Sequence, residues 1–257
     1  MTELHESIVF ITGASSGIGQ SCARAFAEAG AKLILAARRK NRLKQLAAEL
    51  KKQFHTETFI GELDVRDHRA VARFYKKLPV QWQNIDILIN NAGLSRGLNK
   101  VYEGEIEDWN EMIDTNVKGL LYVSRAVLPG MVERKKGTVI NIGSIAGHEV
   151  YPAGNVYCAT KHAVDALTKG MRLDVVDTPI RVCTVDPGLV ETEFSEVRFH
   201  GDKERAKKTY QNMTPLTPDD IADAVVFAAT RPPHVQIAEL VIMPTAQAST
   251  TLVHRQP

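Results

Sequence analysis

The sequence is poor in cysteine and has no long hydrophobic run. Its 257 residues include three cysteines, Cys22, Cys158 and Cys183, none of which belongs to a C-x-x-C pair. An odd number without such a pair argues against a disulfide framework and fits a reducing compartment. No apolar stretch approaches the roughly 20 residues of a transmembrane helix. The first residues, Met1–Glu6, have neither a basic start nor an apolar segment, so we expect a cytoplasmic protein with no membrane partner.

The chain also lacks an excess of charge of either sign. There are 32 Lys and Arg residues against 30 Asp and Glu residues, a net charge of +2. This balance gives no electrostatic reason to expect a nucleic-acid partner. Hydrophobic residues make up 44% of the chain and charged residues 24%, which is ordinary for a globular protein with a sizeable core. The length fits one large domain.

A glycine-rich turn follows the first apolar run. Ser7–Ile11 is rich in β-branched residues and predicts a buried strand, and the stretch from 20 to 29 after the turn has helical composition. Between them lies a G-x-x-x-G-x-G turn. Such a turn lets the backbone approach a pyrophosphate and places it at a helix N-terminus, although a plain tight turn is the alternative. The residues expected to contact a cofactor here are Gly13, Ser15, Ser16, Gly17, Ile18 and Gly19.

Arginines follow the second predicted strand, Lys32–Ala37. Arg38 and Arg39 come directly after it, and Arg42 lies one helical turn further on. In a dinucleotide fold an acid at this place binds the 2′-OH of NAD, whereas arginine accommodates the 2′-phosphate of NADP. The acid is missing here, and a positive cluster at a helix start opposes the helix dipole unless an anion relieves it. The pattern favours NADP(H) over a merely solvated basic helix start.

The remaining chain alternates between strand and helix patterns. Further strands are expected at 56–64, 84–89, 138–142, 181–185 and 235–243, with helices at 43–52, 67–78, 108–133, around 157–161, and 219–230. This rhythm predicts an α/β fold, a doubly wound parallel sheet (Rossmann fold), in a single domain over residues 1–257. Ligands bind at the carboxyl ends of such strands. Small or polar residues at or just after those ends complete the expected cofactor site: Asp64, Val65, Asn91, Ala92, Gly93, Pro187, Gly188, Val190 and Thr192.

Two segments fit this rhythm poorly. Residues 189–218 show no clear strand, are polar, and carry Phe194, Arg198 and Tyr210. A segment of this length inside a compact domain is typical of a lid, so we expect a substrate-binding loop there. The tail, residues 245–257, is short and polar, which fits either an interface arm or a disordered end.

Tyr157 and Lys161 are spaced to lie on one face of a helix, one turn apart. Ser144 follows the strand before them. Tyrosine is a poor acid or base at neutral pH because its pKa is about 10, and a nearby ammonium group lowers that value. The spacing alone is also compatible with a packed tyrosine and a solvent-exposed lysine. No His, Asp or Glu spacing is typical of a metal site, so we expect no metal.

Together these motifs resemble the short-chain dehydrogenase/reductase family over essentially the whole chain. Asn116, Ser144, Tyr157 and Lys161 match its catalytic tetrad. The other matching segments are the turn 12–19, Asn90–Gly93, and Pro187-Gly188 with Thr192. Several stretches are similar to the NADP-dependent 3-hydroxy acid dehydrogenases, which act on serine, L-allo-threonine and related acids: 108–116, 125–134, 154–157, 193–199 and 253–256.

One position departs from the family pattern. Relatives that prefer NADP often carry a basic residue just before the second glycine of the turn, where this chain has Ser16. The prediction of NADP(H) therefore depends on Arg38 and Arg39, and on Ala37 in place of an acid.

The resemblance implies a role for each tetrad residue. Tyr157 exchanges a proton with the substrate oxygen, and Ser144 holds that oxygen. Lys161 lowers the pKa of Tyr157 and, with Tyr157, contacts the cofactor. Asn116 holds a water that continues the proton path. For the substrate carboxylate we expect Arg198, with Tyr151 and Asn155 nearby, because arginine pairs with a carboxylate through two parallel hydrogen bonds; a surface arginine on a mobile loop is the alternative.

Other functions remain open at this point. Close relatives reduce sulfoacetaldehyde, whose sulfonate could occupy the same cationic pocket, and a broad-range aldehyde/ketone reductase would use the same tetrad. A redox-sensing NADP-binding protein without turnover is disfavoured because such proteins tend to lose the tyrosine or the lysine. Family members are commonly tetramers, so the resemblance implies a homotetramer.

Overall fold

A single parallel sheet forms the centre of the molecule. The structure, a computed structural model, describes residues 4–256, so residues 1–3 and 257 of the predicted domain lie outside it. Seven strands pair in the order β3-β2-β1-β4-β5-β6-β7, which confirms the predicted doubly wound sheet. They are β1 (Ile8–Thr12), β2 (Lys32–Ala37), β3 (Thr58–Glu62), β4 (Ile87–Asn90), β5 (Thr138–Ile142), β6 (Arg181–Pro187) and β7 (Glu239–Ile242).

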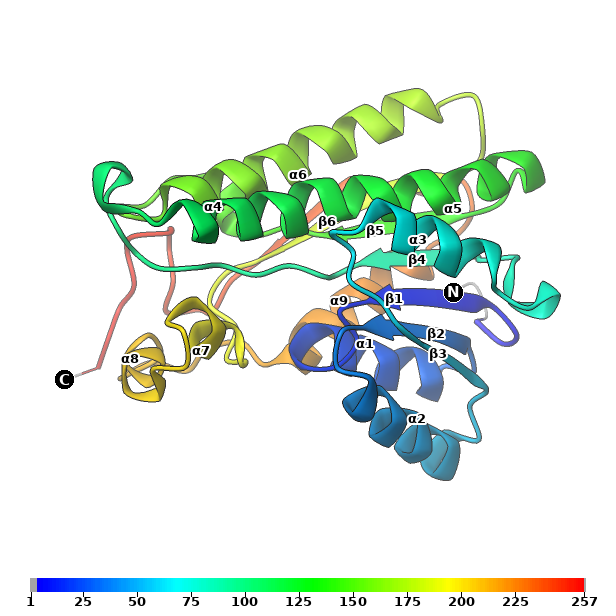
Figure 1. Cartoon of the computed structure of the whole chain (residues 1–257), viewed down its shortest axis with the longest axis horizontal. Coiled ribbons are helices and arrows are strands. Elements are labelled where there is room, and N and C mark those ends of the chain that lie inside the picture. Colours follow the sequence, from blue (N-terminus) through cyan, green and yellow to red (C-terminus); the bar gives the residue numbers. More distant parts are fainter. Residues whose placement is uncertain (1–3, 257) are drawn as a thin grey trace.

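Helices cover both faces of this sheet (Figure 1). One face carries α1 (Gly17–Glu28), α2 (Lys40–Phe54) and α9 (Pro218–Ala229). The opposite face carries α3 (His68–Lys76), α5 (Leu120–Arg134) and α6 (Asn155–Asp174). The helix α4 (Ile106–Ile113) precedes α5, and α7 (Phe194–Arg198) and α8 (Lys203–Lys208) lie beyond one end of the sheet.

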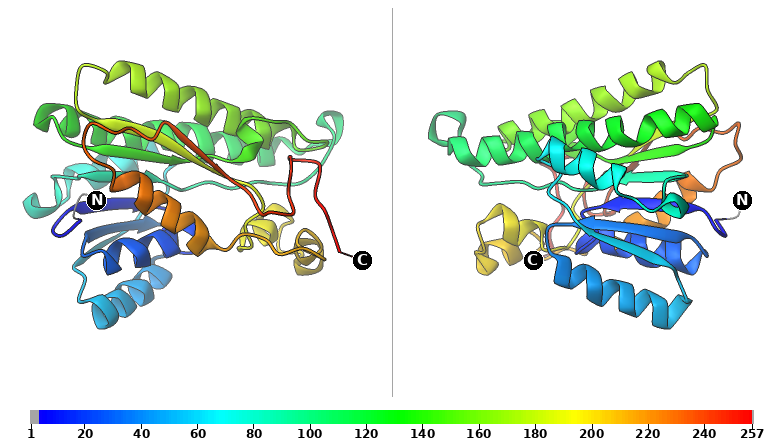
Figure 2. Two further views of the ribbon diagram at one scale, coloured as in Figure 1. Left: turned by 180° about the vertical axis from the view of Figure 1, so that it is seen from behind. Right: turned by 45° about the vertical axis from the view of Figure 1, so that its right-hand side comes forward.

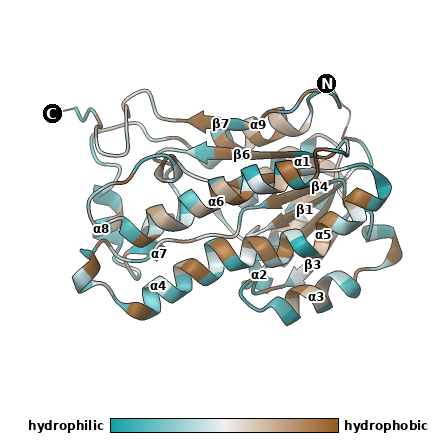
Figure 3. Ribbon diagram, turned by 90° about the horizontal axis from the view of Figure 1, so that it is seen from above, coloured by the Kyte–Doolittle hydropathy of each residue, from teal (hydrophilic) through white to brown (hydrophobic). Residues whose placement is uncertain are grey.

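The strand sequences divide the core into two layers. Successive side chains of a strand point to opposite faces. Thus Val9 and Ile11 of β1 pack with α1, α2 and α9, whereas Ile8 and Phe10 pack with α3, α5 and α6. A strand buried on both faces needs apolar residues at every position, and in Figure 3 the strands are mostly coloured hydrophobic while the helices alternate. No helix among residues 4–256 is both long and apolar enough to cross a membrane.

The chain order reverses between β1 and β4. From β1 the sheet grows one way through β2 and β3, and from β4 it grows the other way. A crevice forms at the carboxyl ends of two such strands, where open α/β sheets bind ligands. The fold therefore opens a site next to the glycine turn after β1 and the Asn90–Gly93 segment after β4.

One predicted helix is interrupted. The pattern predicted a continuous helix over 108–133, but α4 ends at Ile113 and a π-helical turn, η3 (Asp114–Gly119), separates it from α5. Such turns are rare in helices and occur frequently at functional sites. Asn116 lies within η3, so the interruption falls on a predicted catalytic residue.

The two segments outside the rhythm are folded. Residues 189–218 contain α7, α8 and a parallel bridge between Val190 and Leu216, more regular structure than predicted. The tail returns along this segment (Figure 2), where the Gln256 main-chain N donates to the Asn212 carbonyl at 2.8 Å. Thr250 also donates to Glu149 Oε2, through its main-chain N at 2.9 Å. The expectation of a disordered tail is therefore wrong over residues 245–256, because hydrogen bonds to distant segments hold it.

Candidate active site

A cavity of about 640 Å³ lies at the carboxyl ends of the strands. Most of the predicted site residues line it, from the glycine turn, the two segments after β2 and β4, helix α6 and the 189–218 segment. Gly19, Asn116 and Asn155 do not line it. All but three of the predicted site residues thus lie together around this cavity.

The glycine turn has the geometry of a phosphate cradle. Gly13 and Gly17 have φ angles of +65° and +53°, in the left-handed region that favours glycine. A Cβ on Gly13 would lie 2.8 Å from Asn91 Nδ2, and one on Gly19 would lie 2.6 Å from the Gly13 carbonyl. Helix α1 begins at Gly17, and the Ser16 side chain does not cap it, so first-turn N–H groups remain for an anion. These features fit the pyrophosphate of a dinucleotide, with Gly19 shaping the turn from within.

Arg39 lies over this turn. Its Nε donates to Ser15 Oγ at 3.1 Å and its Nη2 donates to Ser16 Oγ at 2.5 Å. Arg38 instead points to Glu111, with Nη1 3.5 Å from Oε1. The serine that departs from the family pattern therefore contacts the arginine expected to replace its missing charge.

Glu193 is a site residue that the sequence did not reveal. Its Oε2 accepts from Arg39 Nη1 at 2.8 Å, and its Oε1 accepts from Arg42 Nη1 at 2.6 Å. Burial alone would raise the pKa of Glu193, but the two arginines outweigh burial and lower it. The end of β2 has no acid of its own, but the 189–218 segment places Glu193 there, 154 residues along the chain from Arg39. The only signal for Glu193 in the sequence was its place in the 193–199 stretch that resembles the 3-hydroxy acid dehydrogenases.

Tyr157 and Lys161 are both buried. Burial raises the pKa of Tyr157 well above its usual value, and Tyr151 adds to that, while Arg198 and a hydrogen bond with Ser144 oppose it. Lys161 Nζ donates to the Ile142 carbonyl at 2.8 Å and lies 5.9 Å from the centre of the Tyr157 ring. Burial also lowers the pKa of Lys161 to about 8, which Asp186 partly opposes. The net change in the Tyr157 pKa is opposite to the predicted one, because desolvation exceeds the effect of nearby charge.

Asn116 joins two elements of the site. Its Nδ2 donates to the Leu94 carbonyl at 2.8 Å and to Thr160 Oγ1 at 3.0 Å, and its Oδ1 accepts from the Leu94 main-chain N at 2.9 Å. Both amide protons are therefore used within the protein. The side chain holds the segment after β4 against α6.

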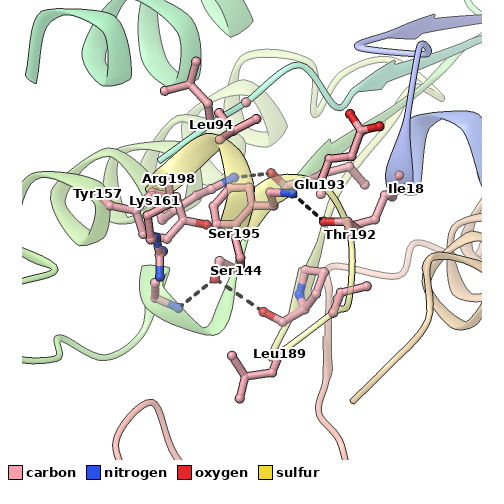
Figure 4. Close-up of a pocket in the computed structure, with 18 of the residues that line it drawn as sticks. Ile18, Leu94, Ser144, Tyr157, Lys161, Leu189, Thr192, Glu193, Ser195 and Arg198 are labelled. Carbon is pink, nitrogen blue, oxygen red and sulfur yellow. Dashed lines mark hydrogen bonds between the residues drawn. The ribbon is translucent and has the colours of Figure 1, made fainter. Parts of the chain in front are cut away.

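Arg198 projects into the cavity beside Tyr157 (Figure 4). Its guanidinium carbon lies 5.2 Å from the centre of the Tyr157 ring and 5.1 Å from that of Phe194. Nη2 donates to the Tyr151 hydroxyl at 3.0 Å, while Nε is buried without a hydrogen-bond partner. Among residues 4–256 no carboxylate forms an ion pair with Arg198. The alternative of a surface arginine on a loop is thus wrong, and the site contains a cation with unused donor capacity.

Asn155 is not part of this cavity. Its Nδ2 donates to the Asn99 carbonyl at 2.9 Å, and its Oδ1 accepts from the Val156 main-chain N at 2.7 Å. It lines a small adjoining pocket instead. The tail also lines the main cavity, through Val253 and Arg255, which the sequence pointed to only by the likeness of 253–256, and through Thr250 and Thr251, which it did not point to.

The fold gathers three potential metal ligands that the sequence spacing did not indicate. One ligand atom from each of His148, Asp186 and Glu239 lies within 4.8 Å of the others. Asp186 Oδ1 accepts from the Ser144 main-chain N at 3.1 Å, and Oδ2 accepts from Thr184 Oγ1 at 2.7 Å. These hydrogen bonds give the carboxylate a structural role in placing Ser144, and the absence of a metal stays a prediction.

The chain belongs to the short chain dehydrogenase family, whose family model matches residues 7–203. The relatives are more specific. The chain is 50% identical over 250 residues to the NADP-dependent 3-hydroxy acid dehydrogenase of Salmonella typhi, covering 96% of this chain and 99% of that one. It is 46% identical over 257 residues to the enzyme of the same name from Schizosaccharomyces pombe, with 100% and 99% covered. A solved structure of the closed form of serine dehydrogenase complexed with NADP+ has a TM-score of 0.91 and 49% identity, covering 97% of this chain and 100% of that one.

Proposed function

We propose that this protein transfers a hydride between NADP(H) and a small 3-hydroxy acid of the serine, L-allo-threonine or 3-hydroxypropionate type, or its carbonyl form. The observation that carries the proposal is Arg198, a half-buried cation whose guanidinium carbon lies 5.2 Å from the ring centre of Tyr157 and whose buried Nε has no hydrogen-bond partner. A carboxylate one or two carbons from the reacting hydroxyl would reach it. The names of the relatives support the same substrate class.

Tyr157 exchanges the proton of the reacting oxygen. In the oxidising direction its phenolate takes the proton of the alcohol, and in the reducing direction its hydroxyl donates one. Ser144 Oγ holds the same oxygen through a hydrogen bond. NADP(H) when bound accepts or supplies the hydride. Lys161 holds a positive charge near the phenol, and the raised pKa of Tyr157 makes that charge necessary for reaction at neutral pH.

Other residues bind and position. Arg39, with Ser15 and Ser16, would hold the 2′-phosphate of the cofactor, since arginine binds phosphate oxygens through a planar fork. Arg198 and Tyr151 would hold the substrate carboxylate. A water on the proton path would be held by the main chain at Asn116, because both protons of its side-chain amide are committed.

The alternatives share the same residues. A sulfonate would also pair with Arg198, and a neutral aldehyde or ketone would leave it unpaired at a cost, since an unsatisfied buried donor is unfavourable. The hydroxy acid is favoured because the relatives carry that name.

A substrate panel tests the proposal. NADP+ and NAD+ reduction would be measured with L-serine, L-allo-threonine, 3-hydroxypropionate, isethionate and a simple secondary alcohol. We expect turnover with the carboxylates. The kcat/KM with NADP+ should be at least about 100-fold above that with NAD+, because NAD+ lacks the 2′-phosphate and its charge-assisted contact with Arg39. A preference for the neutral alcohol, or for isethionate, would contradict it.

We further propose a cytoplasmic homotetramer. Leu121, Val132, Leu173 and Val176 on and just after α5 and α6 are between 38% and 79% exposed, and helix faces of this kind suit contact between copies. Light scattering after gel filtration should give four times the mass of one chain, and a mass of one chain would refute this assembly.

A further inference from the structure

Glu193 pairs with Arg39, the arginine assigned to the cofactor phosphate, and with its neighbour Arg42. One carboxylate bridges two guanidinium groups, at 2.8 Å from Arg39 Nη1 and 2.6 Å from Arg42 Nη1. Arg39 also contacts both serine hydroxyls of the glycine turn. Two guanidinium groups thus donate to a single anionic group beside the glycine turn, which is an arrangement that also suits a phosphate monoester.

We propose that Glu193 is an internal substitute for the 2′-phosphate of NADP(H), and that it competes with this phosphate for Arg39 and Arg42. The inference builds on the proposed role of Arg39 and goes beyond it. A dianionic phosphate and a carboxylate cannot share the same donors without like-charge repulsion. Binding of the phosphorylated cofactor therefore displaces Glu193, whereas a cofactor without the phosphate leaves it in place.

The position of Glu193 connects this exchange to the substrate side. Glu193 immediately precedes α7, whose Phe194 lies 5.6 Å from the ring of Tyr157 and whose last residue is Arg198. Figure 4 shows Glu193 and Thr192 on the side of Ile18, and Arg198 on the side of Tyr157. The five residues of α7 thus join the phosphate site to the carboxylate site. Release of Glu193 frees the N-terminal end of the helix that carries Arg198.

The effect on affinity should be moderate. The side chains of Glu193, Arg39 and Arg42 are each 40–44% exposed, and exposed ion pairs contribute little because water screens them. When an internal competitor occupies a site part of the time, the apparent affinity of the ligand equals its intrinsic affinity multiplied by the fraction of protein in which the site is free. We expect removal of the Glu193 charge to raise the affinity for a ligand that carries the 2′-phosphate roughly three- to tenfold.

Calorimetry on Glu193→Gln with 2′,5′-ADP and 5′-AMP tests the competition without turnover. Glutamine keeps the size of the side chain and removes its charge. The dissociation constant for 2′,5′-ADP should fall roughly three- to tenfold, and that for 5′-AMP should stay unchanged. Glu191→Gln is the matched control, since it removes the same charge two residues away on an exposed side chain outside the cavity, and it should leave both constants unchanged.

An unchanged or weaker affinity of Glu193→Gln for 2′,5′-ADP would overturn the inference, since Glu193 would then be neutral or a co-ligand. Arg39→Ala separates this failure from a failure of the proposed function. If Arg39→Ala loses affinity for 2′,5′-ADP and keeps it for 5′-AMP, the assignment of Arg39 stands whatever Glu193 does. If Arg39→Ala binds 2′,5′-ADP normally, both the assignment and the competition are wrong.

Discussion

Burial disfavours the charged forms of both Tyr157 and Lys161. Both side chains are buried in the first two turns of α6. Burial raises the pKa of the phenol and lowers the pKa of the ammonium group to about 8. At neutral pH Lys161 keeps its positive charge, and in the proposed mechanism that charge offsets the raised pKa of Tyr157. The pair illustrates how an active site keeps residues that do not favour folding.

The cost of burying Lys161 should be measurable. A pKa lowered from 10.5 to about 8 corresponds to about 3 kcal/mol at a pH below 8, where the folded protein must hold the buried charge. The unfolded chain binds the extra proton between pH 8 and 10.5, so stability attributable to this residue rises with pH across that window. The difference in unfolding free energy between Lys161→Met and the parent protein should therefore shrink by about 3 kcal/mol from pH 8 to 10.5.

Chemical denaturation at several pH values provides this measurement. Lys169→Met is the control, because Lys169 lies on the same helix but is exposed. If the difference in unfolding free energy between Lys161→Met and the parent protein did not change with pH, the ammonium group would not be desolvated in the folded protein.

Tyr157→Phe should lose turnover and keep the cofactor. Removal of a general acid/base lowers kcat by about 10³-fold, while the packing of the ring against Phe194 is retained. NADPH binding, followed by fluorescence, should change less than about threefold. Tyr102→Phe, at an exposed tyrosine, should behave as the parent, and a near-normal kcat in Tyr157→Phe would refute the mechanism.

At the scale of elements, the π-helical turn η3 determines what Asn116 does. Its side chain holds both main-chain groups of Leu94 and the hydroxyl of Thr160. This makes Asn116 a link between the segment after β4, which lines the cavity, and the helix that carries Tyr157. The sequence predicted Asn116 as a site residue but placed it in a regular helix. A single π-helical turn is too short to change the hydrophobic periodicity of the surrounding helix visibly.

Asn116→Ala should break this link. Three hydrogen bonds are lost and both main-chain groups of Leu94 lose their Asn116 partner, while Thr160 Oγ1 still donates to the Tyr157 carbonyl. The unfolding free energy should therefore fall by about 3 kcal/mol. The KM for NADP+ should also rise, because the segment after β4 lines the cavity proposed for the cofactor. Asn110→Ala, at an exposed position of α4, should stay within about 0.5 kcal/mol of the parent. Equal stability of the two variants would show that the link contributes nothing.

The remaining elements show what local pattern can predict. The strands were predicted because buried parallel strands read as continuous apolar runs. The helix predicted from residue 67 starts where Asp67 accepts from the Arg69 and Ala70 main-chain N atoms, as aspartate commonly does at a helix N-cap. Helices α7 and α8 were not predicted. They are five and six residues long, too short to show a period.

At the scale of the whole molecule, the site depends on contacts that no local pattern encodes. Glu193 reaches Arg39 across 154 residues and Arg198 reaches Tyr151 across 47, and the tail closes against 209–212 through Arg255 and Gln256. The sheet topology brought the predicted strand ends together as expected, because parallel strands end on one edge. Which side chain then faces which depends on how the 189–218 segment packs, and only the structure shows that.

In the proposed function, Arg198 is the residue that makes a general hydride-transfer site specific for an acid. It comes from α7, whereas Tyr157 comes from α6, and the two meet only in the folded chain. Its loss should therefore affect substrates according to their charge rather than the chemical step. Arg205 belongs to the same segment but stacks on Phe199 and lies outside the cavity, so Arg205→Ala is the matched control.

The most direct measurement compares kcat/KM for 3-hydroxypropionate and for 1-propanol, which carries a methyl group in place of the carboxylate, in the parent protein, Arg198→Ala and Arg205→Ala. Loss of a buried charge-assisted contact should lower the value for the acid by about 100-fold in Arg198→Ala. The value for 1-propanol should change less than about threefold, and Arg205→Ala should match the parent with both substrates. An equal loss for acid and alcohol, or no loss for the acid, would contradict the assignment of Arg198 as the carboxylate ligand and, with it, the hydroxy-acid function.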